Sequence, residues 1–374
     1  MPSSSEPIAV VFGGPSPEHD VSVLTGLQAA RQLASSGRSV IGLYWAKTGS
    51  WHRVGADAEA ESFLEGVPRG ADELTFSVGA DGGFASAAGR LGRPRPLPVD
   101  VAVLCCHGGP GEDGSLQGAF DLAGVRYTGP TAAGAALGMD KLAFGALMAS
   151  AGLPTLPRRL LTGPGDDVGF DGPYIVKPRF GGSSIGVDVV ADLPTAVARL
   201  RTNPHLRRGA VVEPFRADLH DLNIAVRSWP ELSLSAIERP LRSGAGSEIL
   251  GYADKYVGGE GMASAPRELP AELAPPAAEQ VRAAAGRVAQ LCGLRGVARV
   301  DFLASSDGEL FVNEINTIPG SLARYLWVDP PVAFDELLGA LVDEARRRPS
   351  AHYDATGADG SVLRSAGSIA GKLG

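Results

Sequence analysis

The chain has 374 residues, of which 44% are hydrophobic and 20% are charged, and this is the composition of a globular protein of two or three domains rather than of a disordered or fibrous one. Its net charge of −8 supplies no positive field for a nucleic acid or an anionic membrane, and no segment approaches the roughly 20 apolar residues of a membrane span. Three cysteines without metal-ligand spacing, and a start that does not resemble a signal peptide, predict a reduced, cytoplasmic protein.

Strands and helices alternate along the chain, which predicts an α/β architecture. Residues 66–98 are rich in glycine, alanine and proline and only weakly periodic, so we expect them to form a surface excursion. The predicted strands are 8–12, 99–105, 174–178, 210–215, 223–228, 232–237, 297–303 and 310–316, and the predicted helices are 17–34, 139–153 and 277–292. These elements divide the chain into an N-terminal domain 1–133, a central domain 134–213, a C-terminal domain 214–348 and a polar tail 349–374.

The last two predicted strands flank Asp307-Gly308, a dipeptide typical of a two-residue hairpin turn. In such a turn Ser306 pairs with Glu309, and each further pair of opposed residues follows by counting outward from it. The register of the hairpin can therefore be predicted from the sequence alone.

That register places four polar side chains on one face of the hairpin, with Asp301 opposite Glu314 and Arg299 opposite Asn316. Because opposed like charges repel, a cation is expected to neutralise the two acids. A hard divalent ion such as Mg²⁺, which takes oxygen ligands and substrate phosphates, suits this set better than zinc. The alternative is a solvated polar face on which Arg299 screens the acids.

A lysine and a glycine–serine loop follow the predicted strand 174–178. Lys177 lies at the end of the strand, and Gly181-Gly182-Ser183-Ser184 comes directly after it. Glycines let backbone N–H groups approach phosphate oxygens, and lysine adds a point charge, so the pattern predicts a phosphate-binding loop. Lys141, at a helix start, is a second candidate cation. The alternatives are an ordinary hairpin loop with an extended lysine, and an exposed Lys141.

Three polar residues follow the carboxyl ends of predicted strands, where open α/β sheets bind ligands. Ser16-Pro17-Glu18 is typical of a helix start with Ser16 as the N-cap, and Glu18 could also face a cleft. His107 and Glu112 occupy the same kind of position after the strand 99–105. A purely structural role remains the alternative for Glu18 and for His107.

Six motifs occur in a fixed order along residues 8–327. They are GGPSPEHDVSVLTG (13–26), HGGPGEDGSLQG (107–118), MDK (139–141), VKPRFGGSSIG (176–186), ADKY (253–256) and GVARVDF with VNEINTIPG (296–320). Together they resemble the D-alanine–D-alanine ligase family of ATP-grasp enzymes. The resemblance implies a three-domain ATP-grasp architecture with an N-terminal parallel sheet and with ATP held between the central and C-terminal domains. It also implies small amino acids as substrates and a cytoplasmic homodimer.

The resemblance implies roles for residues that bind ATP and metal. Those for ATP are Lys141, Lys177, Ser184, Glu213, Asp221 and Lys255, and those for two Mg²⁺ ions are Asp301, Glu314 and Asn316. The two lysines of the central domain would contact the phosphates, and Glu213 would lie at the adenine. Asp221 would take the ribose hydroxyls, where the family commonly has glutamate.

The resemblance also implies which residues hold the amino acids. Glu18 would bind the ammonium of the first amino acid, and Ser183 and Tyr256 would complete that corner. His107 would line the same pocket, and Arg299 would stabilise the oxyanion. The implied reaction activates the first carboxylate as an acyl phosphate, which the amine of the second amino acid then attacks.

One segment departs from the family's pattern. After Pro319-Gly320 the chain continues to Arg324-Tyr325, and Tyr325 stands where the family has a serine in the turn that holds the acceptor's carboxylate. Either Arg324 takes over the carboxylate while Tyr325 reshapes the pocket, or the tyrosine hydroxyl reaches the same oxygen. We therefore expect an acceptor that differs from, or is broader than, D-alanine; the alternative is a differently folded turn that still binds D-alanine.

Three functions follow from these features. The first is D-alanine–D-alanine ligation in peptidoglycan biosynthesis of the cell wall, and the second is formation of another amide in antibiotic-type metabolism. The third, a non-catalytic nucleotide-binding relative, is disfavoured because the phosphate lysines and all the metal ligands are present.

Overall fold

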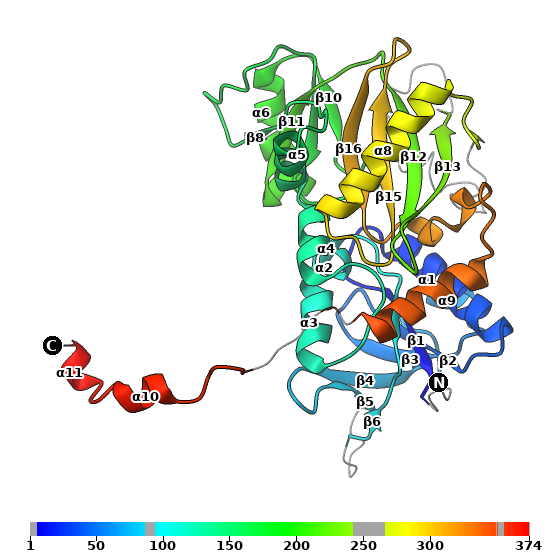
Figure 1. Ribbon diagram of the computed structural model, residues 1–374, viewed down its shortest axis with the longest axis vertical. Helices are drawn as coiled ribbons and strands as arrows, with labels where there is room; N and C mark the ends of the chain where they lie inside the picture. The colour runs from blue at the N-terminus through cyan, green and yellow to red at the C-terminus, as the bar shows by residue number, and fades with distance from the viewer. Residues whose placement is uncertain (1–5, 87–93, 242–265, 349, 351–354, 374) are drawn as a thin grey trace.

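The computed structural model describes residues 6–86, 94–241, 266–348, 350 and 355–373, and they form a mixed α/β fold built on three β-sheets (Figure 1). In Figure 1 the seven-stranded sheet lies at the bottom, and the four-stranded and five-stranded sheets lie above it. The predicted α/β class is confirmed. The division of the chain at residues 133, 213 and 348 stays a prediction.

The seven-stranded sheet is parallel only around β1, which pairs in parallel with β2 and β7. All six residues of β1 are buried, as expected for a strand with parallel neighbours on both sides and no polar residue. The strands, in sheet order, are β6 (Pro96–Leu97), β5 (Gly83–Ser86), β4 (Asp72–Ser77), β3 (Trp51–Val54), β2 (Val40–Trp45), β1 (Ile8–Gly13) and β7 (Ala102–Leu104). The helices of this region are α1 (His19–Ser35), η1 (Ala60–Phe63), α2 (Gly109–Glu112) and α3 (Ser115–Ala123).

Residues 66–98 do not form a surface excursion, and that prediction was wrong. Their described part contributes β4, β5 and β6, which extend the sheet by antiparallel pairing. Leu74 and Phe84 are buried, and the ring centroids of Phe84 and Trp51 lie 5.1 Å apart. A few large side chains among many small residues are enough to fix these strands, although they produce only a weak periodic pattern.

The four-stranded sheet is antiparallel throughout and has the order β10-β9-β11-β8. Its strands are β8 (Arg159–Leu161), β9 (Tyr174–Pro178), β10 (Asp188–Val190) and β11 (Ala210–Pro214), accompanied by α6 (Leu193–Thr202) and η2 (Pro204–Arg208). Along β9, Val176 belongs to the core of this sheet, whereas Ile175 and Lys177 line a pocket, as the alternation of side chains along a strand requires.

The five-stranded sheet has the order β14-β13-β12-β15-β16. Its strands are β12 (His220–Arg227), β13 (Ser233–Pro240), β14 (Arg267–Glu268), β15 (Val297–Ala304) and β16 (Leu310–Asn316). Its neighbouring helices are α4 (Ala132–Met139), α5 (Lys141–Ser150) and α8 (Pro275–Leu291). Phe144 and Met148 of α5 share a core with Ile224, Val281 and Val300, so α5 is anchored to this sheet while its first residue reaches toward β9.

The chain then returns to the N-terminal sheet through η4 (Gly320–Leu326) and α9 (Phe334–Arg347). Leu326 of η4 and Leu341 of α9 belong to the same core as Val10 and Phe12 of β1. This packing brings the end of β16 next to the carboxyl ends of β1 and β7, so residues from all three sheets meet in one region.

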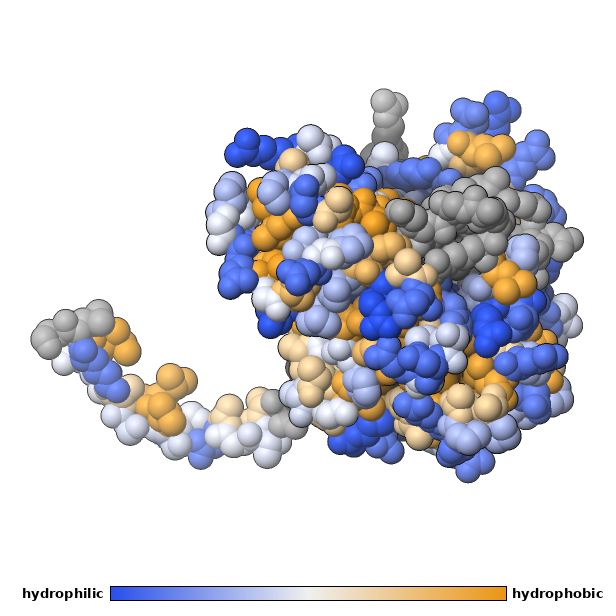
Figure 2. All heavy atoms as spheres, turned by 90° about the horizontal axis from the view of Figure 1, so that it is seen from above, coloured by the Kyte–Doolittle hydropathy of each residue, from blue (hydrophilic) through white to orange (hydrophobic). Residues whose placement is uncertain are grey.

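The C-terminal tail contains the short helices α10 (Ser361–Ser365) and α11 (Ala370–Leu373), which project away from the body (Figures 1 and 2). Figure 2 shows hydrophobic residues on this segment, and Val362, Leu363 and Ile369 are exposed. Among the described helices, none has the length and apolar character needed to cross a membrane.

Candidate active site

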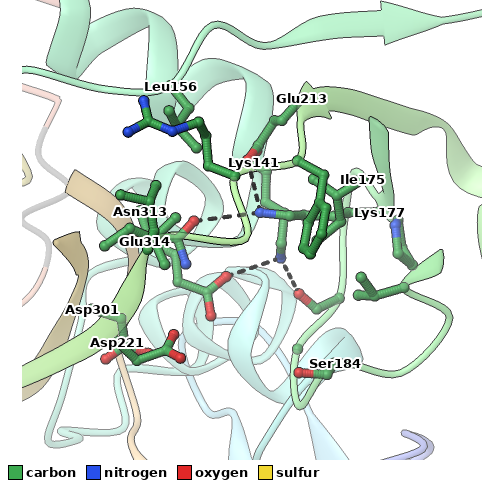
Figure 3. A pocket seen from close by; sticks show the side chains of 18 of the residues that line it. Lys141, Leu156, Ile175, Lys177, Ser184, Glu213, Asp221, Asp301, Asn313 and Glu314 are labelled. Atoms are coloured by element: carbon green, nitrogen blue, oxygen red, sulfur yellow. Dashed lines mark hydrogen bonds and ion pairs between the residues drawn. The ribbon is translucent and has the colours of Figure 1, made fainter. Parts of the chain in front are cut away.

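Two lysines from different elements lie in one pocket (Figure 3). Lys177 of β9 and Lys141 at the start of α5 are only 8% and 9% exposed. Nζ of Lys177 lies 2.8 Å from Oε2 of Glu213 and 3.4 Å from Oδ1 of Asn313, and Nζ of Lys141 lies 3.5 Å from Oε2 of Glu314. Neither lysine extends into solvent, so the alternatives of a snorkelling Lys177 and an exposed Lys141 are wrong.

Glu213 is fully buried on β11 and is held between two cations. Its Oε1 lies 2.7 Å from Nε of Arg158, and its Oε2 accepts a hydrogen bond from Lys177. Burial by itself raises the pKa of Glu213, but the charges of Arg158 and Lys177 outweigh it, so the pKa lies below its ordinary value. Glu213 therefore keeps its charge and fixes the position of Lys177.

The glycine–serine loop after β9 bends over this pocket. Ser183 and Ser184 have φ values of 53° and 58°, a left-handed conformation that costs roughly 1–2 kcal/mol for each non-glycine residue. Contacts at two points compensate: the Ser183 hydroxyl donates to Glu18, and Lys141 donates to the carbonyl of Gly181. The loop thus connects the pocket lysines to the N-terminal region.

The hairpin of β15 and β16 presents the polar face predicted from its sequence. Asp301 pairs with Glu314 and Arg299 with Asn316. Arg299 donates to both oxygens of Asp301, at 2.6 and 2.7 Å, and Nδ2 of Asn316 donates to Oδ2 of Asp301 at 2.9 Å. Arg299 thus screens Asp301, as in the alternative of a polar face on which Arg299 neutralises the acids, while Lys141 faces Glu314.

The turn of this hairpin differs from the prediction. Ala304 pairs with Leu310, and the N–H of Ser305 donates to the carbonyl of Glu309, so three residues connect the strands instead of two. Gly308 has a φ of 99°, which suits the left-handed position of a three-residue turn. The predicted pairing of Ser306 with Glu309 was therefore wrong.

A β-bulge at Asn313 restores the predicted register at the site. Phe302 pairs with Val312, whereas its neighbour Asp301 pairs with Glu314, so Asn313 is the extra residue. Because of the bulge, the consecutive residues Asn313 and Glu314 both line the lysine pocket, which strict alternation along a strand would forbid.

Glu18 closes a second, smaller cavity beside the first, together with Glu112, Lys141, Glu314 and Asn316. It is 8% exposed and lies just before α1, which begins at His19. Ser16 is therefore not the N-cap; its hydroxyl instead accepts the N–H of Glu18 at 3.1 Å.

Gly108 packs against Glu18 and must be glycine. Its φ of 62° and ψ of 174° form a conformation that essentially only glycine adopts, and a Cβ atom there would also lie 2.3 Å from Oε2 of Glu18.

Glu112 lines the same cavity; the sequence placed it, like His107, after the strand 99–105 where ligands bind, but assigned it no specific contact. It accepts the N–H groups of Gly108 at 2.9 Å and Ile318 at 3.0 Å. Burial, followed by the charge of Glu18, raises the pKa of Glu112 to about 8. The motif HGGPGEDG was the available signal, because it places this acid five residues after His107. Three acids, Glu18, Glu112 and Glu314, line this cavity together with Lys141, an arrangement that favours a positively charged group such as an ammonium.

His107 is neutral and connects α1 to the segment between β16 and η4. Its Nδ1 lies 2.7 Å from the carbonyl oxygen of Ile318, so Nδ1 donates, and Nε2 accepts from the hydroxyl of Thr25 at 2.8 Å. Thr25 in turn accepts the N–H of Ser321 at 3.0 Å. Burial lowers the pKa of His107 to about 4. This is the structural role considered for His107, and its contact with an amino acid stays a prediction.

The turn that departs from the family pattern has an unusual backbone. Ser321, Leu322 and Ala323 have φ values of 50°, 51° and 51°. Tyr325 packs beneath Arg267, whose guanidinium lies 4.7 Å from the ring, and burial followed by the charge of a neighbouring glutamate raises the pKa of the phenol. This turn therefore points Tyr325 inward.

Arg324, by contrast, is exposed and stacks on Phe334 of α9, at 5.5 Å. The structure thus brings Tyr325 toward Arg299 and leaves Arg324 on the surface. Lys255 and Tyr256 lie outside the described residues.

The larger pocket gathers most of the residues expected to bind ATP and metal. Those that line it are Lys141, Lys177, Ser184, Glu213, Asp221, Asp301 and Glu314. Figure 3 shows Asp221 and Asp301 side by side at one end, away from Glu213. Apolar side chains, among them Ile175, Leu219 and Leu303, complete the wall. A cavity with cations, carboxylates and apolar surface can take a molecule that is part polyphosphate and part flat ring.

Comparison with known families identifies the chain. The model described as D-ala D-ala ligase N-terminus matches residues 7–130, and that described as D-ala D-ala ligase C-terminus matches residues 166–343. The chain belongs to the D-alanine–D-alanine ligase family. It is thus an enzyme of the ATP-dependent ligase class and has the ATP-grasp architecture.

Individual relatives agree along nearly the whole chain. A D-alanine--D-alanine ligase from Methylobacterium sp. (strain 4-46) is 34% identical and covers 91% of both chains. One from Nocardia farcinica (strain IFM 10152) is 33% identical over 91% of this chain and 97% of its own. Among solved structures, the VanG D-Ala:D-Ser ligase from Enterococcus faecalis is 25% identical, with a TM-score of 0.73 over 91% of this chain and 99% of that one. D-alanyl-alanine synthetase A from Vibrio cholerae O1 biovar eltor str. N16961 has a TM-score of 0.75 at 22% identity over 92% of this chain and 99% of that one, which shows a common fold.

Proposed function

We propose that this family member is an ATP-dependent ligase that joins two molecules of D-alanine and supplies the dipeptide for peptidoglycan biosynthesis. The observation that carries the proposal is the meeting of two kinds of site. Two lysines, Lys141 and Lys177, line the larger pocket together with the carboxylates of the hairpin, and Glu18 closes the adjoining cavity. Cations for a polyphosphate and an acid for an ammonium thus lie next to each other.

The pocket supports attack of a carboxylate on the γ-phosphate of ATP. Lys141 and Lys177 would neutralise the phosphate oxygens, and the Ser183-Ser184 loop would cover them. The first D-alanine, held by its ammonium at Glu18, would direct a carboxylate oxygen at the γ-phosphorus, and ADP would leave. The amine of the second D-alanine would then displace phosphate from the acyl phosphate, with Arg299 stabilising the negative oxygen of the tetrahedral centre.

The hairpin residues fit Mg²⁺ by the chemistry of their donor atoms. Asp301 and Glu314 offer carboxylate oxygens and Asn316 an amide oxygen, which suits a hard ion that completes its shell with water and substrate phosphates. Among the described residues, no group of three or more His, Cys, Asp or Glu could hold a metal by itself, so the phosphates would be needed as ligands. We propose two Mg²⁺ ions, which would supply electrostatic stabilisation of the transferred phosphate when bound.

The other function considered, ligation of a different acceptor in antibiotic-type metabolism, is not favoured. It depends on Arg324 and Tyr325, and Arg324 lies on the surface against Phe334. The curated relatives quoted above act as D-alanine--D-alanine ligases by name and match over 91% of this chain. Tyr325 is the feature that an acceptor screen would test. The homodimer and the cytoplasmic location stay predictions from the family resemblance.

A phosphate-release screen tests the function directly. The protein is incubated with ATP, Mg²⁺ and each of a set of D- and L-amino acids, alone and in pairs, and each product is identified by mass. We expect D-alanine alone to give phosphate and D-alanyl-D-alanine in equal amounts. Phosphate release only with a mixed pair would contradict the proposal and support a different acceptor.

A further inference from the structure

Arg158 is a buried cation at the back of the nucleotide pocket. It lies just before β8, is 7% exposed, and comes from a stretch, Pro157-Arg158-Arg159, that has the sequence of an ordinary charged surface. Burying a guanidinium is costly unless its N–H groups find partners. The partners of Arg158 therefore indicate what it does.

Its three nitrogens contact three different elements. Nε lies 2.7 Å from Oε1 of Glu213 on β11, and Nη1 donates to the backbone carbonyl of Lys141 at 3.0 Å. Nη2 donates to the backbone carbonyl of Asn313 on β16 and lies 3.4 Å from its Oδ1. One planar group thus fixes the start of α5, the carboxylate of β11 and the bulge of β16, which a lysine could not do from a single nitrogen.

We propose that Arg158 is a positioning residue that holds Lys177 and Lys141 ready for the phosphates of ATP. This inference rests on the proposed function, in that it takes ATP to be the ligand of the pocket. Arg158 itself lies behind Glu213 and does not line the pocket, so it acts through the two lysines.

For Lys177 the effect passes through Glu213. Each oxygen of that carboxylate has one cation, Oε1 with Arg158 and Oε2 with Lys177. Without Arg158, the whole charge of the buried carboxylate would act on Lys177 and hold its ammonium back from a phosphate. Because Arg158 neutralises part of the charge of Glu213, the ammonium of Lys177 can still attract a phosphate of the nucleotide.

For Lys141 the effect passes through the backbone. Arg158 binds the carbonyl of Lys141 itself, so the first turn of α5, from which the side chain projects, is fixed relative to β11. Asn313 connects the two lysines further, because its backbone carbonyl accepts from Arg158 and its side chain lies 3.4 Å from Nζ of Lys177.

The test compares ATP with adenosine, which has the base and ribose but no phosphate. In Arg158→Lys and Arg158→Gln, ATP affinity measured by calorimetry should fall about 10-fold or more, the effect of losing hydrogen bonds to a charged group. The affinity for adenosine, measured as its inhibition constant against ATP, should fall clearly less than the affinity for ATP, because adenosine has no phosphate for the two lysines. The KM for D-alanine should stay within about twofold. The matched control is Arg159→Gln, which removes the exposed arginine next in the chain, the first residue of β8, and should bind ATP normally.

A double-mutant cycle with Glu213→Gln gives a second measurement. Because Arg158 is proposed to act through Glu213, the losses in ATP affinity should be strongly non-additive. Arg158→Lys that binds ATP like the unaltered protein would overturn the inference. So would equal losses for ATP and adenosine, which would mean that Arg158 only supports the pocket wall. These binding measurements do not require ligation. A protein that binds ATP but makes no dipeptide would contradict the proposed function, and the effect of the Arg158 variants on ATP affinity could still be measured.

Discussion

Asp301 of β15 and Glu314 of β16 lie directly opposite each other, and each carboxylate has its own cation. Arg299 donates to both oxygens of Asp301, and Lys141 lies 3.5 Å from Glu314. Opposed like charges on a sheet face are destabilising, so these partners keep the two acids together. The same pairing directs two carboxylate groups, which can ligate a metal, toward the lysine pocket, where a metal-bound triphosphate would lie.

Removing the charge of Glu314 tests the metal assignment. Glu314→Gln should keep the fold and lose Mg²⁺-dependent ATP turnover, because one metal ligand supports several kcal/mol of transition-state stabilisation, about 100-fold or more in rate. The measurement is kcat at saturating ATP over a Mg²⁺ titration. Asp307→Asn, in the turn of the same hairpin, is the control and should be active. Near-normal turnover by a folded Glu314→Gln would reject the metal role.

Glu18 is predicted to bind the ammonium of the first amino acid. Glu18→Gln should raise the KM for D-alanine at the first site by about 10-fold or more, because a buried charge pair is lost, while ATP affinity stays unchanged. Steady-state kinetics and ATP calorimetry on the same preparation check both parts. Asp20→Asn changes an exposed acid two residues away, which pairs with Lys47 at 3.1 Å, and should behave normally. A loss of ATP affinity with normal amino-acid kinetics would move Glu18 out of this role.

His107 should make stability depend on pH. Its pKa is lowered from 6.5 to about 4, so between these values the unfolded chain binds a proton that the folded protein does not. The contribution, about 3 kcal/mol, is complete above about pH 6.5 and is lost as the pH falls toward 4.

Denaturant unfolding at several pH values measures this dependence. His107→Gln should be less stable at pH 7, because the bonds to Ile318 and Thr25 are weakened, and its stability should change less between pH 6.5 and 4. His205→Gln, at an exposed histidine, should follow the unaltered protein. Parallel pH curves for the His107 variant and the unaltered protein would show that His107 is not buried in its neutral form.

The hairpin site could be predicted from the sequence because the alternation of side chains along the two strands, together with the positions of the charged residues, allows few ways of pairing the strands. Asp301 and Glu314 were placed opposite each other correctly, but through two compensating differences: the turn has one residue more than predicted, and the bulge at Asn313 adds one to the other strand. Neither Asp307-Gly308 nor Asn313 reveals this locally, since both features are set by the twist and packing of the whole sheet.

Other parts of the site depend on contacts between distant segments and could not be predicted. Arg158 meets Glu213 and Asn313 only after three elements have packed together, and its own neighbours in the chain suggest a solvated surface. The strands within 66–98 were missed because they are short and lie in a segment rich in glycine and alanine, so that the alternation of Leu74 and Phe76 extends over one strand only. The lysines, by contrast, were found because their motifs are local in sequence.

The most direct test of ATP-dependent D-alanine ligation uses D-alanine labelled with ¹⁸O in its carboxylate as the sole amino acid. D-alanyl-D-alanine should form with a second-site kcat/KM of about 10⁴ M⁻¹s⁻¹ or more, in the ordinary range for enzymes. The released phosphate should carry one ¹⁸O atom, because a carboxylate oxygen attacks phosphorus and leaves with it when the second amine forms the amide. Failure to form the dipeptide, or dipeptide formed with unlabelled phosphate, would contradict the proposed reaction.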